Sequence, residues 1–239
     1  PQEFASWTFR KAPRFFDVVT YTGNGTAGRT IAHDLGVAPG MIIVKDLNRG
    51  THWFTYHTGI GATKAVTLNQ TDVASTSTAY WNDTEPTDSV FSLGTHGDIN
   101  TNAQSFVAYL FAHDPDGEND DGMIACGSYT GTGSAGNAID IGWEPQYVLI
   151  KNSSHLEGWV TFDSMRGFIQ KDASTSSQLL MPNTSAAEVT SVACGPTSTG
   201  FILNNTDDKI NATNESYIYM AIRAPMMKEP EAGTEVFAI

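Results

Sequence analysis

Carboxylate side chains concentrate in one turn-rich segment of this 239-residue chain, residues 114–122. Asp114, Asp116, Glu118 and Asp120 stand at alternating positions along it. Oxygen ligands spaced in this way suit a hard cation such as Ca²⁺, although the glycine comes earlier than in the EF-hand pattern. The sequence therefore leaves two interpretations open, a Ca²⁺ site and a solvated acidic linker without a metal.

A second candidate site is aromatic. Tyr80 and Trp81 stand together in a polar segment and are followed by Asn82 and Asp83. Exposed aromatic rings beside amide and carboxylate groups are what sugar stacking and hydroxyl recognition require. A small hydrophobic cluster beneath a long loop uses the same residue types. The sequence leaves both interpretations open, a glycan or receptor contact and a packed loop.

Side chains that can be combined on paper into a His/Asp catalytic set are scattered through the first half of the chain. They are His33, Asp34, His52, His57, His96 and Asp98. Their spacing demands no common site, and neither a Gly-x-Ser-x-Gly elbow nor a His-Glu-x-x-His motif occurs. Glycoside hydrolysis needs two carboxylates at a defined separation, and 26 acidic residues give no basis for choosing a pair. We therefore predict no enzymatic activity, and no cofactor unless the acidic segment binds Ca²⁺.

The elements that must position these residues come in two copies. Tyr21–Gly25 returns as Tyr129–Gly133, and each copy closes with an aromatic-rich apolar run, Phe106–Phe111 or Tyr217–Ile222. Between these marks, Gly36, Pro39, Lys45, Trp53, Thr55 and Gly61 return as Gly142, Pro145, Lys151, Trp159, Thr161 and Gly167. Self-similarity at a fixed period indicates an internal duplication. A third such run, Phe4–Phe9, opens the chain, and we expect it to form a strand at an edge of the first copy.

Short apolar or alternating runs separated by Gly, Asn, Asp, Ser and Thr predict strands and turns throughout. In the first copy the runs are Phe16–Tyr21, Met41–Lys45, Trp53–His57, Val66–Leu68, Val90–Leu93 and Phe106–Phe111. In the second they are Ile124–Tyr129, Tyr147–Lys151, Gly158–Phe162, Leu179–Met181, Phe201–Leu203 and Tyr217–Ile222. This pattern predicts an all-β chain of two tandem antiparallel β-sandwich modules, jelly-roll-like and related by duplication.

The expected organisation follows the repeat. Residues 1–15 are the closing strand of a preceding repeat, 16–115 the first module, 116–122 an acidic linker, 123–227 the second module and 228–239 a connector to further sequence. The recurring Trp53 and Trp159 are expected to superpose as largely buried core anchors. The recurring Lys45 and Lys151 are expected to form a structural ion pair or to extend along the surface.

Charge and cysteine content restrict the partners. The net charge is −13, and residues 65–121 contain ten acidic residues and no Lys or Arg. Nucleic acid and anionic membranes suit such a surface poorly, because phosphate binding needs clustered cations; a neutral glycan, a protein or a cation suits it better. No apolar run approaches the length of a membrane span. Cys126 and Cys194 have no counterparts in the first copy and no metal-binding spacing, so we expect free, buried thiols.

Five stretches together resemble a module of bacteriophage tail-fibre and related virion surface proteins, as in marine phages. They are Trp7–Pro13, Phe15–Gly25, His33–Lys45, Tyr217–Pro225 and Gly233–Phe237. The resemblance implies a protein of the virion tail fibre that forms a homotrimer, contacts other tail proteins and takes part in host attachment through a cell-surface glycan or protein. We therefore expect a spacer or receptor-contacting segment; the alternatives are a lectin-like carbohydrate-binding module and a capsule polysaccharide depolymerase.

Overall fold

The computed structural model describes residues 6–117, 122–168, 177–192 and 194–224. Within these residues the helical part is limited to α1 (Gly97–Asn100) and the 3₁₀ turn η1 (Ser164–Arg166). The strands up to residue 117 are β1 (Phe16–Thr22), β2 (Arg29–Ala32), β3 (Pro39–Asp46), β4 (Phe54–His57), β5 (Lys64–Thr67), β6 (Ser75–Thr76), β7 (Val90–Leu93) and β8 (Ser105–Ala112). Those after residue 122 are β9 (Ile124–Thr130), β10 (Asn137–Asp140), β11 (Pro145–Asn152), β12 (Trp159–Asp163), β13 (Ser177–Leu179), β14 (Val189–Val192), β15 (Cys194–Thr197), β16 (Gly200–Leu203) and β17 (Ser216–Arg223). The predicted all-β class is confirmed.

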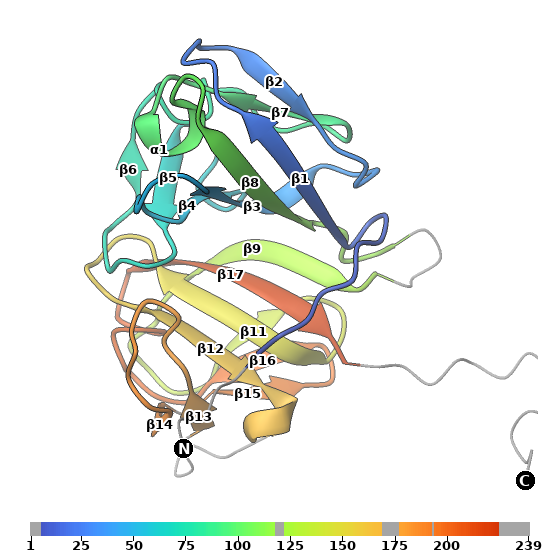
Figure 1. Cartoon of the computed structure of the whole chain (residues 1–239). Helices are drawn as coiled ribbons and strands as arrows, with labels where there is room; N and C mark the ends of the chain where they lie inside the picture. The colour runs from blue at the N-terminus through green and yellow to red at the C-terminus, as the bar shows by residue number, and fades with distance from the viewer. Residues whose placement is uncertain (1–5, 118–121, 169–176, 193, 225–239) are drawn as a thin grey trace, which may run out of the picture.

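Two main sheets form the middle of the molecule. The first main sheet has the order β1-β8-β3-β4-β5-β6, and the second main sheet has the order β12-β11-β17-β9. The pair β2-β7 lies on the outer side of the first, and β10-β16-β15 lies on the outer side of the second (Figure 1). Every strand pairing among the described residues is antiparallel, which is consistent with a β-sandwich architecture.

The two main sheets are built alike. β8 lies between β1 and β3, as β17 lies between β9 and β11. Even the irregularities correspond, because the register shifts between Pro39 and Met41 in one sheet and between Pro145 and Tyr147 in the other. These parallels support the hypothesis of internal duplication. No strand after residue 122 joins a sheet of the first half within the described residues.

The repeated glycine turn is a steric requirement in both halves. Gly25 and Gly133 have positive φ angles of 68° and 64°, a conformation that favours glycine. A Cβ atom at Gly23 would lie 2.1 Å from a carbonyl oxygen of the loop before β8, and one at Gly131 would lie 2.0 Å from the corresponding oxygen before β17. The loop before the closing strand therefore packs directly on the turn backbone.

A buried asparagine fixes each of these contacts. Asn100 and Asn211 are both fully buried. The Oδ1 atom of each accepts a backbone N–H of the glycine turn, and the Nδ2 atom donates to two backbone carbonyls. Because a buried polar group without partners is costly, this complete set of bonds secures the turn in one arrangement.

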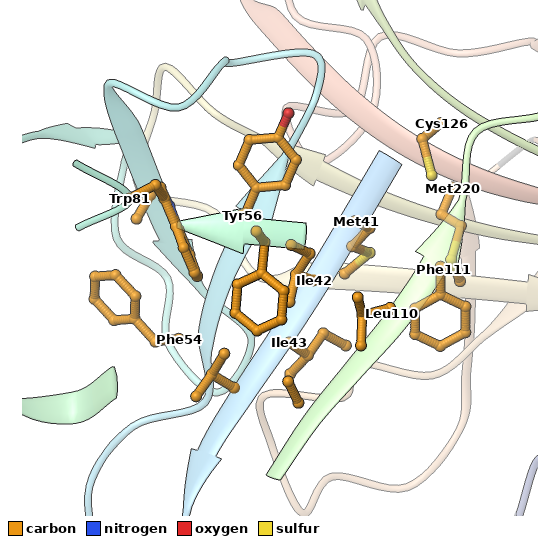
Figure 2. Packing of buried hydrophobic residues seen from close by; sticks show 14 of the residues in the cluster. Met41, Ile42, Ile43, Phe54, Tyr56, Trp81, Leu110, Phe111, Cys126 and Met220 are labelled. Carbon is orange, nitrogen blue, oxygen red and sulfur yellow. The ribbon is translucent and has the colours of Figure 1, made fainter. Parts of the chain in front are cut away.

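The two main sheets pack against each other at the interface between the two halves of the chain, which we call the seam. They share one hydrophobic core there. Cys126 and Met220 of the second main sheet belong to the same buried cluster as Met41 and Phe111 of the first, and Figure 2 shows these four side chains close together. Trp159, which is 1% exposed, joins the cluster and donates its Nε1 hydrogen to the carbonyl of Thr67. The halves are therefore separate in strand pairing but joined in their packing.

Polar side chains in the seam are satisfied across it. His57 is buried, its Nε2 lies 2.9 Å from the carbonyl oxygen of Tyr219, and its Nδ1 accepts the N–H of Gly59. The fully buried Lys151 donates to the backbone carbonyls of Thr71, Asn152 and Glu157. Burial lowers the pKa of Lys151 to about 8. Neither the expected ion pair nor a surface position describes this lysine, because carbonyl oxygens surround its ammonium group.

Lys45, the counterpart of Lys151, likewise donates to backbone carbonyls, those of Arg49 and Thr51.

The prediction of free, buried thiols is confirmed for Cys126 and Cys194. The tryptophan prediction is correct for Trp159 and wrong for Trp53, which is only partly buried. The difference arises because Trp159 faces the opposite half, whereas Trp53 lies beside the uncovered part of its sheet.

The predicted strand Phe4–Phe9 is wrong for the part that the structure describes, since residues 6–9 are not in a strand. Phe4 lies outside the described residues. The segment leaves β1 and runs down over the second half (Figure 1). Its rings pack on both halves without strand pairing: the partly buried Phe9 packs on Phe16 and Phe111, and the more exposed Trp7 reaches the second main sheet at Tyr147. The predicted connector 228–239 also lies outside the described residues.

We predict that the two equivalent tryptophans differ in their effect on stability. Trp159→Ala removes a ring from the shared core and should cost about 3–5 kcal/mol. Trp53→Ala, at the partly exposed equivalent position, should cost about 1–2 kcal/mol. Urea unfolding followed by circular dichroism should show a single transition for both variants. Equal costs, or separate transitions for the two halves, would contradict the shared core.

We further predict a loss of stability in acid that originates at His57. Burial lowers the pKa of His57 to about 4, against an ordinary value of 6.5. The unfolded chain therefore takes up this proton first, and stability should fall by up to about 3 kcal/mol as the pH drops from 6.5 to 4. His57→Gln keeps a donor for the Tyr219 carbonyl and does not titrate. Melting temperatures measured over this range should depend less on pH in the variant; identical profiles would refute the assignment.

Candidate functional site

A groove follows the seam on the side where the N-terminal segment crosses it. Two cavities, of about 600 Å³ and 450 Å³, adjoin at Trp7, Thr8 and Phe9, which line both. We call the two together the seam groove. Its upper part lies on β1, β3 and β8, and its lower part lies on β11, β12 and η1. Each cavity falls within the size range of ordinary ligand sites.

The upper part of the groove is aromatic. Tyr109 on β8 stands opposite Ile43 on β3 and Val18 on β1 in the strand register, so all three lie on one face of the first main sheet. The ring of Trp53 stacks on that of Tyr109, with centroids 6.2 Å apart and planes inclined by 23°. The second main sheet covers the neighbouring part of this face and leaves these rings along the groove.

The lower part of the groove is polar. Asp163 ends β12 and caps η1, accepting the backbone N–H and the Nε hydrogen of Arg166. It also accepts the indole N–H of Trp7 at 3.1 Å. The guanidinium of Arg166 lies 5.0 Å from the centre of the Trp7 ring, and Tyr147 meets the same ring edge-on at 6.0 Å. Burial raises the pKa of Tyr147 to about 12, so its phenol is neutral at ordinary pH.

The aromatic loop predicted from the sequence is not an open binding surface. Trp81 is 1% exposed, packs between Phe54 and Tyr56 and donates its indole hydrogen to the carbonyl of Lys64 (Figure 2). The prediction that it stacks on a sugar is therefore wrong, because its ring belongs to the core. The alternative, a cluster beneath the loop, is correct.

The other members of that predicted site have local roles. Tyr80 packs on Phe54, and its hydroxyl lies 2.7 Å from Ser75 Oγ. Asn82 and Asp83 have positive φ angles of 56° and 47° and form the turn that follows Trp81. Asn and Asp tolerate this conformation better than other non-glycine residues. The polar residues thus serve the turn that buries the indole.

The acidic segment is only partly within the described residues. The carboxylate of Asp114 pairs with Arg14 through two bonds, at 2.6 and 2.8 Å. Asp116 is exposed, while Glu118 and Asp120 lie outside the described residues. The described parts of the chain contain no group of three or more His, Cys, Asp or Glu side chains that could hold a metal ion. Asp114 is therefore a structural partner of Arg14, and the Ca²⁺ site remains a prediction.

The histidines of the hypothetical His/Asp catalytic set lie in separate environments. His57 belongs to the seam, His96 caps α1 and stacks on Phe54, and His52 lies beside Asn69 and Gln70. These contacts are structural ones, with aromatic rings, amides and backbone groups. No helix among the described residues has the length and apolar character needed to cross a membrane.

The fold and the groove define the class: an all-β protein of stacked antiparallel sheets with an aromatic groove along its seam. The family described as a domain of unknown function (DUF7483) matches residues 11–225, and the chain belongs to it. This match spans both halves of the repeat. Neither the curated proteins nor the solved structures yielded a match.

The sequence did not identify Trp7 as a groove residue, nor Asn100 and Asn211 as the residues that hold the glycine turns by hydrogen bonds. The asparagines carried a readable signal, because Ile99-Asn100 and Ile210-Asn211 recur just before the two closing strands. Trp7 carried no comparable local signal. Its partners Tyr147 and Arg166 lie far along the chain, and only the packed seam brings them to it.

We predict opposite behaviour for the buried and the groove tryptophan. Trp81→Ala should cost about 3–5 kcal/mol, because it removes a fully enclosed ring. Trp7→Ala should cost only about 1–2 kcal/mol, since 38% of this residue is exposed and it loses one hydrogen bond and one cation–π contact. Thermal unfolding of both variants checks this, and a stable Trp81→Ala protein would contradict the burial of the loop.

Proposed function

We propose that this chain is a non-enzymatic segment of a bacteriophage tail fibre that contacts the host receptor through the seam groove. The resemblance of its repeated strands and turns to tail-fibre modules supports the first part. The second part rests on one observation: an aromatic groove with a polar end crosses the junction of the two halves. Concave sites with a few placed polar groups are the usual location of ligand binding.

The packing of the seam suits this role. The strands that line the groove belong to sheets that share a buried core, so this part of the groove exists before a ligand arrives. Binding to such a site avoids the entropy of ordering its walls. A rigid body of this kind also serves as a spacer along a fibre. In this proposal the segment works as part of a homotrimer, beside other tail proteins, on the surface of the virion.

The groove chemistry supports binding rather than hydrolysis. Asp163 is the only carboxylate among the described residues that line the two cavities, and it is bonded to Arg166 and Trp7. A glycoside hydrolase of the usual type needs two carboxylates across the scissile bond. A depolymerase is therefore the less supported alternative for this groove.

Immunogold electron microscopy tests the location. An antiserum raised against the purified chain should label the tail fibres of the phage that encodes it, and host cells preincubated with the chain should adsorb fewer phage. An equally folded Trp53→Ala chain is the matched competitor and should compete less well. Particles without label would refute the fibre assignment, and undiminished competition by the variant would remove the groove from the receptor contact.

A further inference from the structure

We infer that the seam groove binds a neutral oligosaccharide, with sugar rings on its aromatic upper part and sugar hydroxyls at its polar lower part. The inference deepens the proposed attachment function by naming the chemical class of the receptor. It uses residues far from the Tyr80–Asp83 loop, whose indole is buried.

The aromatic rings supply the apolar half of such a site. Trp7, Trp53 and Tyr109 line the upper cavity, and each retains part of its surface. A pyranose ring has an apolar face of C–H groups and a polar rim, so it matches aromatic side chains that are open on one side. Tyr109 is stacked between Trp53 and Phe16, so Trp53 and Trp7 are the rings that would meet the sugars.

The polar groups supply the other half. Gln146, Asp163 and Arg166 line the lower cavity and together carry amide, carboxylate and guanidinium groups. Hydroxyl groups both donate and accept hydrogen bonds, and this set offers both partners.

Charge favours a neutral ligand. Arg166 is the only cation among the described residues that line the two cavities, and it forms an ion pair with Asp163 at 2.6 Å. A phosphate, sulfate or uronate would need an unpaired cation to offset its loss of water. The net charge of −13 opposes anionic polymers further.

The middle of the groove floor favours sugars over an extended peptide. β3, β8 and β11 are interior strands, hydrogen-bonded on both sides, so they present side chains. β1 and β12 are the edge strands of their sheets, and Phe16, Val18 and Asp163 are the side chains they contribute to the lining. Peptides that bind as added strands draw their affinity from main-chain bonds to such an edge. Side-chain rings and polar tips are the groups these strands offer.

A glycan array followed by calorimetry tests the inference. The whole chain should bind neutral oligosaccharides and not their sulfated or uronic counterparts. Trp53→Ala and Gln146→Ala should each weaken binding at least tenfold while the melting transition persists. Tyr80→Phe, an aromatic change outside the groove, is the matched control and should leave affinity unchanged. Using two groove variants keeps the test valid if one of them folds poorly.

The outcomes separate this inference from the fibre assignment. An array without neutral hits, a preference for charged glycans or for peptides, or unchanged binding by the folded groove variants would overturn the glycan inference. If the antiserum labels virions while the array shows no glycan binding, the fibre assignment stands and the glycan inference fails. If the array shows binding to neutral glycans while virions are unlabelled, the glycan inference stands and the fibre assignment fails.

Discussion

The burial of one main sheet against the other is the constraint on which this structure depends. Met41 and Phe111 of the first sheet and Cys126 and Met220 of the second fill one cluster, where a loss of volume on either side is felt by both. The polar contacts of His57 and Lys151 fit around this packing, because each places its hydrogen bonds on backbone groups. The two halves, which pair their strands separately, are thereby joined through one core.

The groove is a consequence of the same packing. The second sheet covers only part of the inner face of the first, so the strip that carries Tyr109 and Trp53 remains partly exposed. Trp7 and Phe9 cross this strip and attach to both halves, Phe9 to the first and Trp7 to the second. A site made in this way is specified by the fit between the halves, and it needs no loop of its own.

Many polar contacts recur in the two halves while their surfaces differ, as the hypothesis of internal duplication expects. Asn100 and Asn211 make corresponding bonds to their glycine turns, and the main-chain N–H groups of Trp53 and Trp159 are each accepted by an asparagine. These bonds maintain the shape of a repeat and tolerate little change. Trp53 and Trp159 then diverge in their surroundings, since one ring lies at the groove and the other is enclosed by the opposite half.

The sequence by itself determined most strands of the two main sheets, the glycine turns and the free thiols, but it missed short strands such as β2, β10 and β15. Continuous apolar runs such as Met41–Val44 form buried interior strands. The Tyr-Thr-Gly-x-Gly motif forms a turn in which the last glycine has a positive φ. Both features can be predicted because hydrophobic periodicity and backbone sterics act over a few residues. Only the tertiary structure decided which aromatic rings are enclosed. The sequence left open whether the Trp81 ring is exposed or packed, and it is buried; Trp7 was predicted within a strand but lines a groove. Their environments come from partners distant in the chain, which a local pattern does not encode.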